Sequence, residues 1–156
     1  MKKMLVLLAT AAALVSATGS VAASEERSGP RSTEASQAGM TLVVRNTRYG
    51  RILFDGQNRV LYGFTRDKRN GPSRCYGACA AAWPVYFSKA TVRAGSGVKR
   101  SLIGSVRRRD GRRQVTYNGW PLYYYVDDGP GEVKCQKVDE FGGLWLVVKP
   151  SGALLR

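Results

Sequence analysis

The sequence predicts an all-β domain: a compact antiparallel sandwich or small barrel built from two related repeat units. Three observations predict this fold class. Short segments rich in β-branched and aromatic residues alternate with Asp-Gly, Asn-Gly and Gly-Pro turns, which is the pattern of strands joined by hairpins. One of these segments recurs later in the chain, and after residue 23 no stretch sustains a helical period over three turns.

The first 23 residues have the composition of a secretory signal peptide. Two lysines precede an apolar run over residues 4–15, and the small residues Val21-Ala22-Ala23 follow it. The run is shorter than the roughly 20 residues needed to span a bilayer, so we expect cleavage after Ala23 and no transmembrane segment in the mature chain. No cysteine precedes Cys75, so we also expect no lipid anchor near the cleavage site.

The remaining sequence divides into a leader and one domain. Residues 24–40 are small and polar without periodicity, and such a composition cannot bury enough apolar surface to offset the entropy of ordering. We therefore predict a disordered leader there. Residues 41–156 have the length of a single β domain, with one repeat at about 41–95 and the other at about 105–156.

Six segments of this domain are predicted to form strands. Along Arg59-Val60-Leu61-Tyr62-Gly63-Phe64, alternation places Val60, Tyr62 and Phe64 on one face and Leu61 on the other. The segment CYGACAAAW, residues 75–83, has room for only one or two helical turns. The expected strands lie within TLVVRNT (41–47), RILFDG (51–56), RVLYGFTRD (59–67), QVTYNG (114–119), PLYYYVDD (121–128) and LWLVVKPSG (144–152).

An aromatic-acid motif occurs once in each unit. LYGFTRD (61–67) and LYYYVDD (122–128) both contain Tyr-x-aromatic-x-x-Asp, and a tryptophan follows the motif tyrosine after 21 positions in one unit and 22 in the other. Several anchors at matching spacing indicate two copies of one supersecondary unit packed together. The motif residues are Tyr62, Phe64, Asp67 and Trp83 in the first unit and Tyr123, Tyr125, Asp128 and Trp145 in the second.

These features resemble a family of bacterial secreted repeat proteins of unknown function, often called predicted lipoproteins with the Tyr-x-[Phe/Trp/Tyr]-x-x-Asp motif. The resemblance rests on both motif copies, on a Cys-x3-Cys followed by Trp-Pro, and on YNGWPLYYYVDD and GGLWLVV in the second unit; it covers roughly 41–152. Two features depart from it: no cysteine stands near the start, and Cys135 is additional. The resemblance implies an envelope or exported protein without an established activity.

The motif has two interpretations. We favour a structural one, in which the rings fill the core and each aspartate accepts backbone N–H groups two residues on, because each acid precedes a turn-rich segment. The other is a binding face of stacked tyrosines for a sugar, a quinone-like ring or a cation. Carboxylate catalysis would need two acids at a defined separation, and the candidates are Asp67, Asp128, Glu132, Asp139 and Glu140.

Three cysteines are an odd number for an oxidising compartment. A disulfide between Cys75 and Cys79 is our leading prediction, and repeat equivalence makes Cys135 a rival partner for either of them. One thiol is left over in each case. We expect no metal site and no cofactor, because a closed zinc site needs four ligands and the chain has no histidine, which also excludes His-dependent triads.

The charge favours anionic partners. The chain has a formal net charge of +14, and 23 basic against 11 acidic residues remain once Lys2 and Lys3 are removed with the signal peptide. Such an excess favours anionic envelope polymers or lipids, whereas export and the lack of aromatic residues between 98 and 113 lead us to expect no specific nucleic acid. The basic stretch over residues 99–113 is either a segment that docks on polyanions or a solvated connection between the two units. Its candidate polyanion contacts are Lys99, Arg100, Arg107, Arg108, Arg109, Arg112 and Arg113.

These observations predict a periplasmic or extracellular protein with a non-enzymatic structural or binding role and an affinity for anionic surfaces. Two other classes stay open. A redox or electron-transfer accessory would use the cysteines and tyrosines and would need a functional thiol. A glycan-binding or glycan-hydrolysing domain would need Tyr62 and Tyr123 exposed in one groove, so buried rings would exclude that use of the motif.

Overall fold

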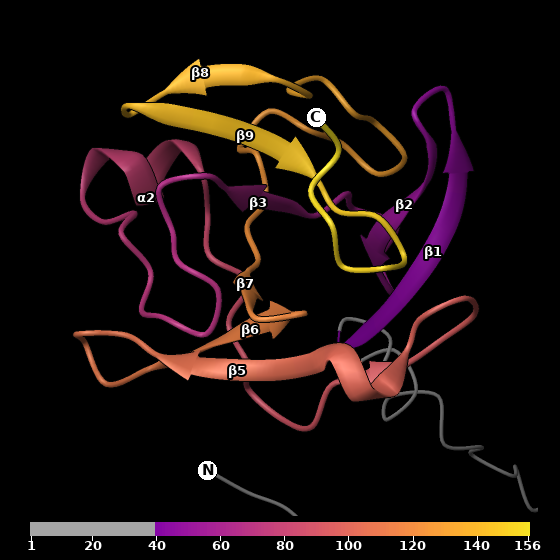
Figure 1. The fold of residues 1–156 in the computed structure, drawn as a ribbon, viewed down its shortest axis with the longest axis horizontal. Coiled ribbons are helices and arrows are strands. Elements are labelled where there is room, and N and C mark those ends of the chain that lie inside the picture. The colour runs from indigo at the N-terminus through magenta and orange to yellow at the C-terminus, as the bar shows by residue number, and fades with distance from the viewer. Residues whose placement is uncertain (1–39) are drawn as a thin grey trace, which may run out of the picture.

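The computed structural model describes residues 40–156. This part of the chain contains nine short strands arranged in three sheets (Figure 1). The sheets are ordered β2-β1-β4, β3-β9-β8 and β5-β6-β7. The elements are β1 (Thr41–Thr47), β2 (Gly50–Asp55), β3 (Tyr62–Phe64), α2 (Ala78–Ala82), β4 (Arg93–Ala94), the 3-10 turn η1 (Arg100–Leu102), β5 (Ile103–Arg107), β6 (Arg113–Tyr117), β7 (Trp120–Pro121), β8 (Val138–Glu140) and β9 (Gly143–Val147).

The predicted all-β class is confirmed. Strand pairing in these sheets is antiparallel apart from a two-residue parallel contact of β4 with β1, and the sheets of residues 40–156 do not close into a barrel. The predicted signal peptide (1–23) and all of the predicted leader (24–40) except Met40 lie outside the described residues. The α-helix of the described part has five residues, and no helix there is long and apolar enough to cross a membrane.

Each unit contains an antiparallel hairpin joined by a two-residue turn. The first joins β1 to β2, with a register from Leu42↔Asp55 to Thr47↔Gly50. In the second unit β6 turns into β7 at Asn118-Gly119, where both residues have positive φ, 50° and 78°. An Asn-Gly pair tolerates two successive residues of positive φ, so the sequence specifies this turn.

The two units exchange strands at the centre of the molecule. β3 of the first unit pairs with β9 of the second, and in return Tyr123 of the second unit bridges Val85 of the first. Between these contacts Tyr62 and Tyr123 face each other and exchange two backbone hydrogen bonds, each 2.9 Å long. Each unit thus completes the β-structure of the other.

The expected strand over 121–128 is largely wrong. Pro121 belongs to the short β7, Tyr123 forms isolated bridges, and the rest of the segment is irregular. The facing chain contains Pro84, whose carbonyl accepts the N–H of Tyr124 at 2.8 Å. Because proline has no N–H to return, the ladder is incomplete beyond this point, where only the Val126 N–H crosses, to the Ala82 carbonyl at 3.0 Å.

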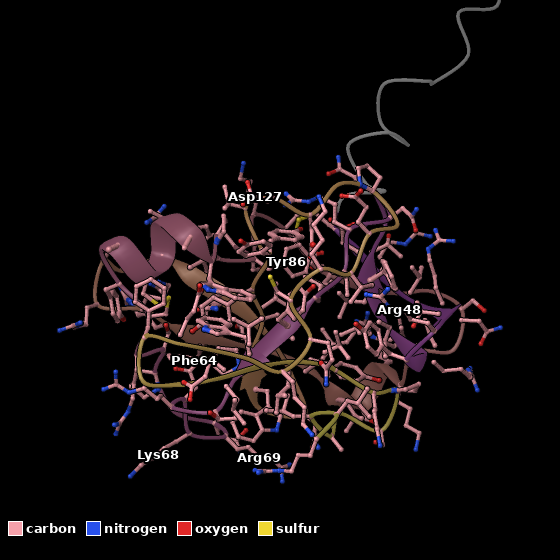
Figure 2. All side chains as sticks on the ribbon, turned by 90° about the horizontal axis from the view of Figure 1, so that it is seen from above. Arg48, Phe64, Lys68, Arg69, Tyr86 and Asp127 are labelled. Atoms are coloured by element: carbon pink, nitrogen blue, oxygen red, sulfur yellow. A yellow bond between two sulfur atoms is a disulfide. The ribbon has the colours of Figure 1, made fainter. Side chains whose placement is uncertain are left out.

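The buried side chains form two clusters on opposite faces of the central strands. As the alternation predicts, Val60, Tyr62 and Phe64 enter one cluster and Leu61 enters the other. Charged side chains such as Arg48 and Lys68 extend from the surface (Figure 2). The first cluster is made of Ile52, Phe54, Val60, Tyr62, Phe64, Cys75, Cys79, Trp83, Tyr123, Cys135, Trp145 and Val147, and the second of Leu42, Leu53, Leu61, Tyr86, Val92, Val115, Tyr117, Leu122 and Val148.

Candidate functional site

The aromatic-acid motifs hydrogen-bond across the two units. The Tyr62 hydroxyl donates to Asp128 Oδ2, and the Tyr123 hydroxyl donates to Asp67 Oδ2, both at 2.6 Å. Each tyrosine therefore meets the acid of the other copy, 66 and 56 positions away. The tyrosine and the aspartate of one motif copy therefore do not bond to each other; each bonds to its counterpart in the other unit.

The two aspartates also fix loops, but not in the way the turn pattern predicts. Asp67 Oδ1 accepts the backbone N–H of Arg74 at 2.7 Å, and Asp128 Oδ1 accepts that of Lys134 at 3.0 Å. These donors lie seven and six residues on rather than two. Each aspartate thus closes a long loop through Oδ1 and accepts the tyrosine hydroxyl of the other unit through Oδ2.

The remaining motif residues form a stack of rings in the first cluster. Trp83 and Trp145 lie parallel with centroids 3.9 Å apart, and Phe64 stacks on Trp145 at 4.1 Å. Tyr125 lies on the other side of Trp83 at 4.9 Å. Each unit contributes one tryptophan to the centre of this stack, so the motif builds the interface between the units.

A glycan groove on the motif tyrosines is excluded by their burial. The rings of Tyr62 and Tyr123 are both 0 % exposed, so no sugar can stack on them. Burial and the adjacent aspartates raise the pKa of both hydroxyls well above the ordinary range. Both therefore stay protonated donors, in keeping with the structural interpretation of the motif.

Burial raises the pKa of the Asp67 and Asp128 carboxyls above the ordinary value, against the opposing effect of the hydrogen bonds that they accept. We expect this to make the protein more stable as the pH falls from neutral towards 4. An acid whose pKa is raised in the folded state contributes stability that is complete below its unfolded pKa, near 3.8, and is lost as the pH rises through the folded pKa.

Urea unfolding at several pH values between 4 and 7 checks this expectation. Asp67→Asn and Asp128→Asn should each flatten the profile. Arg112 lowers the pKa of Asp110, and Lys134 lowers that of Glu132, so these two acids make the folded state less stable as the pH falls. Both acids are exposed, and moderate salt screens their interactions. A midpoint that rises with pH across this window would contradict the account.

The cysteines form one disulfide and one buried thiol. The disulfide joins Cys75 to Cys79, the pair favoured by the sequence, and Cys135 is free and 8 % exposed. Burial raises the pKa of the Cys135 thiol, which reduces the thiolate fraction that redox chemistry requires. Among residues 40–156 no three His, Cys, Asp or Glu side chains gather in a group that could hold a metal ion.

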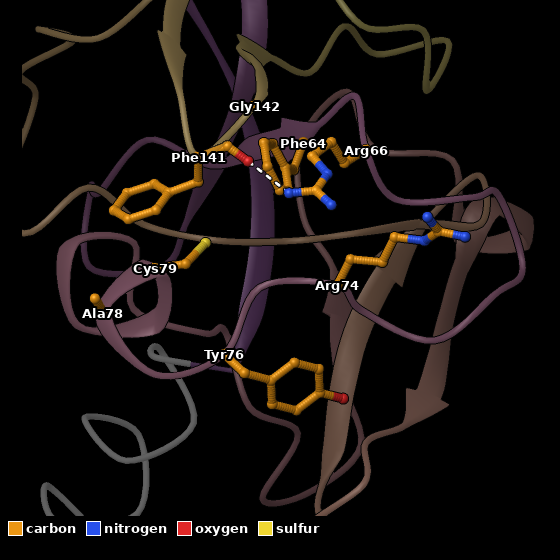
Figure 3. Close-up of a pocket in the computed structure, with 8 residues that line it drawn as sticks. All are labelled: Phe64, Arg66, Arg74, Tyr76, Ala78, Cys79, Phe141 and Gly142. Carbon is orange, nitrogen blue, oxygen red and sulfur yellow. Dashed lines mark hydrogen bonds between the residues drawn. The ribbon is translucent and has the colours of Figure 1, made fainter.

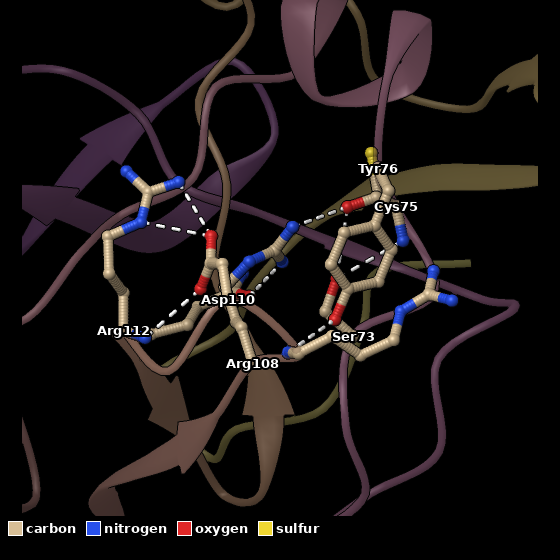
Figure 4. A network of polar contacts seen from close by, with 8 residues as sticks. Ser73, Cys75, Tyr76, Arg108, Asp110 and Arg112 are labelled. Atoms are coloured by element: carbon tan, nitrogen blue, oxygen red, sulfur yellow. Dashed lines mark hydrogen bonds and ion pairs between the residues drawn. The ribbon is translucent and has the colours of Figure 1, made fainter.

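The basic stretch forms the hairpin β5–β6, and one of its arginines is not a surface residue. Arg108 is 4 % exposed, and its guanidinium donates to Gln114 Oε1 and to the carbonyl of Cys75, both at 2.7 Å (Figure 4). Arg108 is therefore removed from the predicted polyanion contacts, because it holds the hairpin to the loop before the helix. The others, Lys99, Arg100, Arg107, Arg109, Arg112 and Arg113, are exposed.

Two aromatic rings that the sequence did not associate with this stretch lie beneath it. The guanidinium carbon of Arg109 lies 4.0 Å from the ring centroid of Tyr76, and that of Arg112 lies 4.0 Å from the centroid of Phe87. Cation–π contacts of this kind order the arginines. No local pattern could have found them, since both rings precede the hairpin in the chain and are brought there by the fold.

A family model described as a secreted repeat of unknown function matches the chain twice, at residues 43–86 and 104–149. The matches cover 44 and 46 of the 156 residues, and each contains one copy of the aromatic-acid motif. They confirm the resemblance drawn from the motif. Comparisons with curated proteins and with solved structures gave no match.

Proposed function

This chain belongs to the family of secreted repeats of unknown function, and from that premise we propose that it is an exported, non-enzymatic binding module whose basic hairpin holds anionic polymers of the cell envelope. The observation that carries the proposal is a cross-strand pair: Arg107 lies directly opposite Arg113 in the β5–β6 register. Like charges in that arrangement destabilise a hairpin. The stability of the fold therefore gives no reason for two arginines at these positions, whereas binding of a polyanion does, because it would neutralise both charges.

The hairpin tip is ordered before any ligand arrives. Arg108 ties it to the body of the domain, and Arg109 stacks on Tyr76. Asp110, the acid of the tip, is paired with Arg112 at 2.7 Å. Side chains that are already ordered lose less entropy on binding, which favours affinity. Periplasmic and extracellular sites both fit this role, since each presents anionic polymers.

Removing two charges from the tip should weaken polymer binding more than removing two charges elsewhere. We expect Arg109→Gln/Arg113→Gln to bind poly(glycerol phosphate) about 30-fold more weakly, because each cation at an anionic surface contributes roughly 1 kcal/mol. Arg45→Gln/Lys149→Gln removes the same charge from exposed positions outside the hairpin and is the matched control. Isothermal titration at two salt concentrations measures both.

Equal weakening in the two double variants would mean that net charge alone drives binding, and it would overturn the assignment to the hairpin. Binding that does not weaken with added salt would contradict an electrostatic mechanism. Vesicles of phosphatidylglycerol, compared with the polymer at equal phosphate concentration, separate a lipid surface from a polymer as the partner.

A further inference from the structure

A cavity of about 480 Å³ opens beside the disulfide (Figure 3). Three aromatic side chains, one disulfide sulfur and two arginines contribute to its lining, and no acidic residue lines it. These lining residues are Phe64, Tyr76, Phe141, Cys79, Arg66 and Arg74.

Phe141 occupies a position that the fold does not explain. It is 39 % exposed and stands with Gly142 in the two-residue turn between β8 and β9, at φ values of 55° and 75°. A bulky side chain at positive φ is strained, and such turns favour asparagine or glycine at this place. The chain itself uses Asn118-Gly119 in the turn between β6 and β7. Strain retained at the edge of a cavity points to a functional reason for the side chain.

The two arginines supply the charge of the cavity. Arg66 Nη1 donates to the carbonyl of Phe141 at 2.8 Å, which holds the strained turn over the opening. The remaining N–H groups of Arg66 form no hydrogen bond within residues 40–156, and the exposed guanidinium of Arg74 forms none in that same part of the chain. Both arginines line the cavity and have N–H groups available to an anion.

The second unit shows that the repeat does not require this chemistry. Asp67 and Asp128 are equivalent, since each closes a loop through the N–H of Arg74 or Lys134. The residue before the aspartate is Arg66 in the first unit and Asp127 in the second, and the residue two positions after the loop-closing N–H is Tyr76 in the first and Gln136 in the second. One copy of the fold thus forms with an acid and an amide at these positions, so the arginine and the ring are not demanded by folding.

We propose that this cavity binds a small aromatic carboxylate, with its ring between Tyr76 and Phe141 above the buried Phe64 and its carboxylate against Arg66 and Arg74. Aromatic walls favour a planar ring in offset or edge contact. The planar fork of arginine matches the two oxygens of a carboxylate. The site is separate from the polymer-binding tip of the hairpin, although Tyr76 contacts both.

The test is an NMR titration of the intact domain with 2-naphthoate and with its neutral analogue 2-naphthamide. We expect saturable shifts with the carboxylate and an affinity at least about tenfold lower for the amide, because a hydrogen bond to a charged group is worth more than a neutral one. Arg74→Gln should weaken naphthoate binding by a similar factor. Arg45→Gln, an exposed arginine outside the cavity, should leave it unchanged.

Phe141→Asn separates a binding role from a structural one. It should abolish naphthoate binding while the melting temperature stays level or rises, since asparagine relieves the strain of the turn. A lower melting temperature would assign Phe141 to folding and overturn the proposal, as would equal affinities for the two probes, retained binding in Arg74→Gln, or no saturable shift in the parent protein. Polymer binding by Phe141→Asn should stay intact, because the cavity is separate from the hairpin tip.

Discussion

Neither repeat unit should fold when it is produced without the other. Residues 40–97 contain β3 but not β9, the strand with which it pairs, and residues 98–156 contain Tyr123 but not Val85. Each fragment also lacks one tryptophan of the central stack. Fragments of fewer than about 60 residues are marginal even with a complete core, so we expect each to be unfolded by circular dichroism.

Mixing the two fragments should restore the native spectrum, because the contacts between the units are noncovalent. The matched control is the full chain cleaved at the same place after folding, which should remain folded. A fragment that forms a folded monomer, as judged by sedimentation and dispersed amide signals, would contradict the exchange of strands between the units. The result decides whether the repeat or the pair of repeats is the folding unit.

Trp145→Ala should have the largest effect among single substitutions. The ring is 0 % exposed and lies between Trp83 and Phe64, with centroids 3.9 and 4.1 Å away, and it meets Tyr123 edge-on. Truncating a fully buried tryptophan costs about 3–5 kcal/mol. Small domains are stable by only about 5–15 kcal/mol, so we expect a protein close to unfolding at room temperature.

Denaturant unfolding followed by circular dichroism measures this loss without relying on tryptophan fluorescence. Trp120→Ala is the control, since Trp120 is only half-buried in β7 and lies outside both core clusters. Its loss of stability should be clearly smaller. Equal losses in the two variants would show that the stack does not hold the units together.

Two copies of one motif have diverged on the outside while keeping one arrangement inside. The crossed pairs Tyr62–Asp128 and Tyr123–Asp67 have the same length, and each acid closes a loop in its own unit. Around them the first unit carries a disulfide and a helix, whereas the second carries a free cysteine and the strand β8. The cavity proposed as a binding site combines these differences, since the first unit supplies Arg66, Arg74 and Tyr76 and the second supplies Phe141.

Local sequence patterns were enough to predict a large part of the fold. Five of the six expected strand segments, the Asn118-Gly119 turn, the alternation of Val60 and Leu61 between faces, and the repeat follow from residue types a few positions apart, whereas β4, β5 and β8 were not expected. Matching spacing of several anchors was enough to identify the repeat, because a repeated unit keeps its internal distances. The same reasoning favoured a buried role for the motif tyrosines, but it placed the contacts of the aspartates within the nearest turn.

Contacts between residues far apart in the chain became visible only in the folded protein. Asp67 reaches Tyr123, Arg108 reaches the carbonyl of Cys75, and Arg66 reaches Phe141, over separations of 56, 33 and 75 positions. The sequence predicts that Arg107, Arg108 and Arg109 are all exposed, because no local pattern indicates which guanidinium will bond to buried acceptors. The physical reason is that burial and hydrogen-bond partnership depend on the packing of distant segments, which no local period or turn specifies.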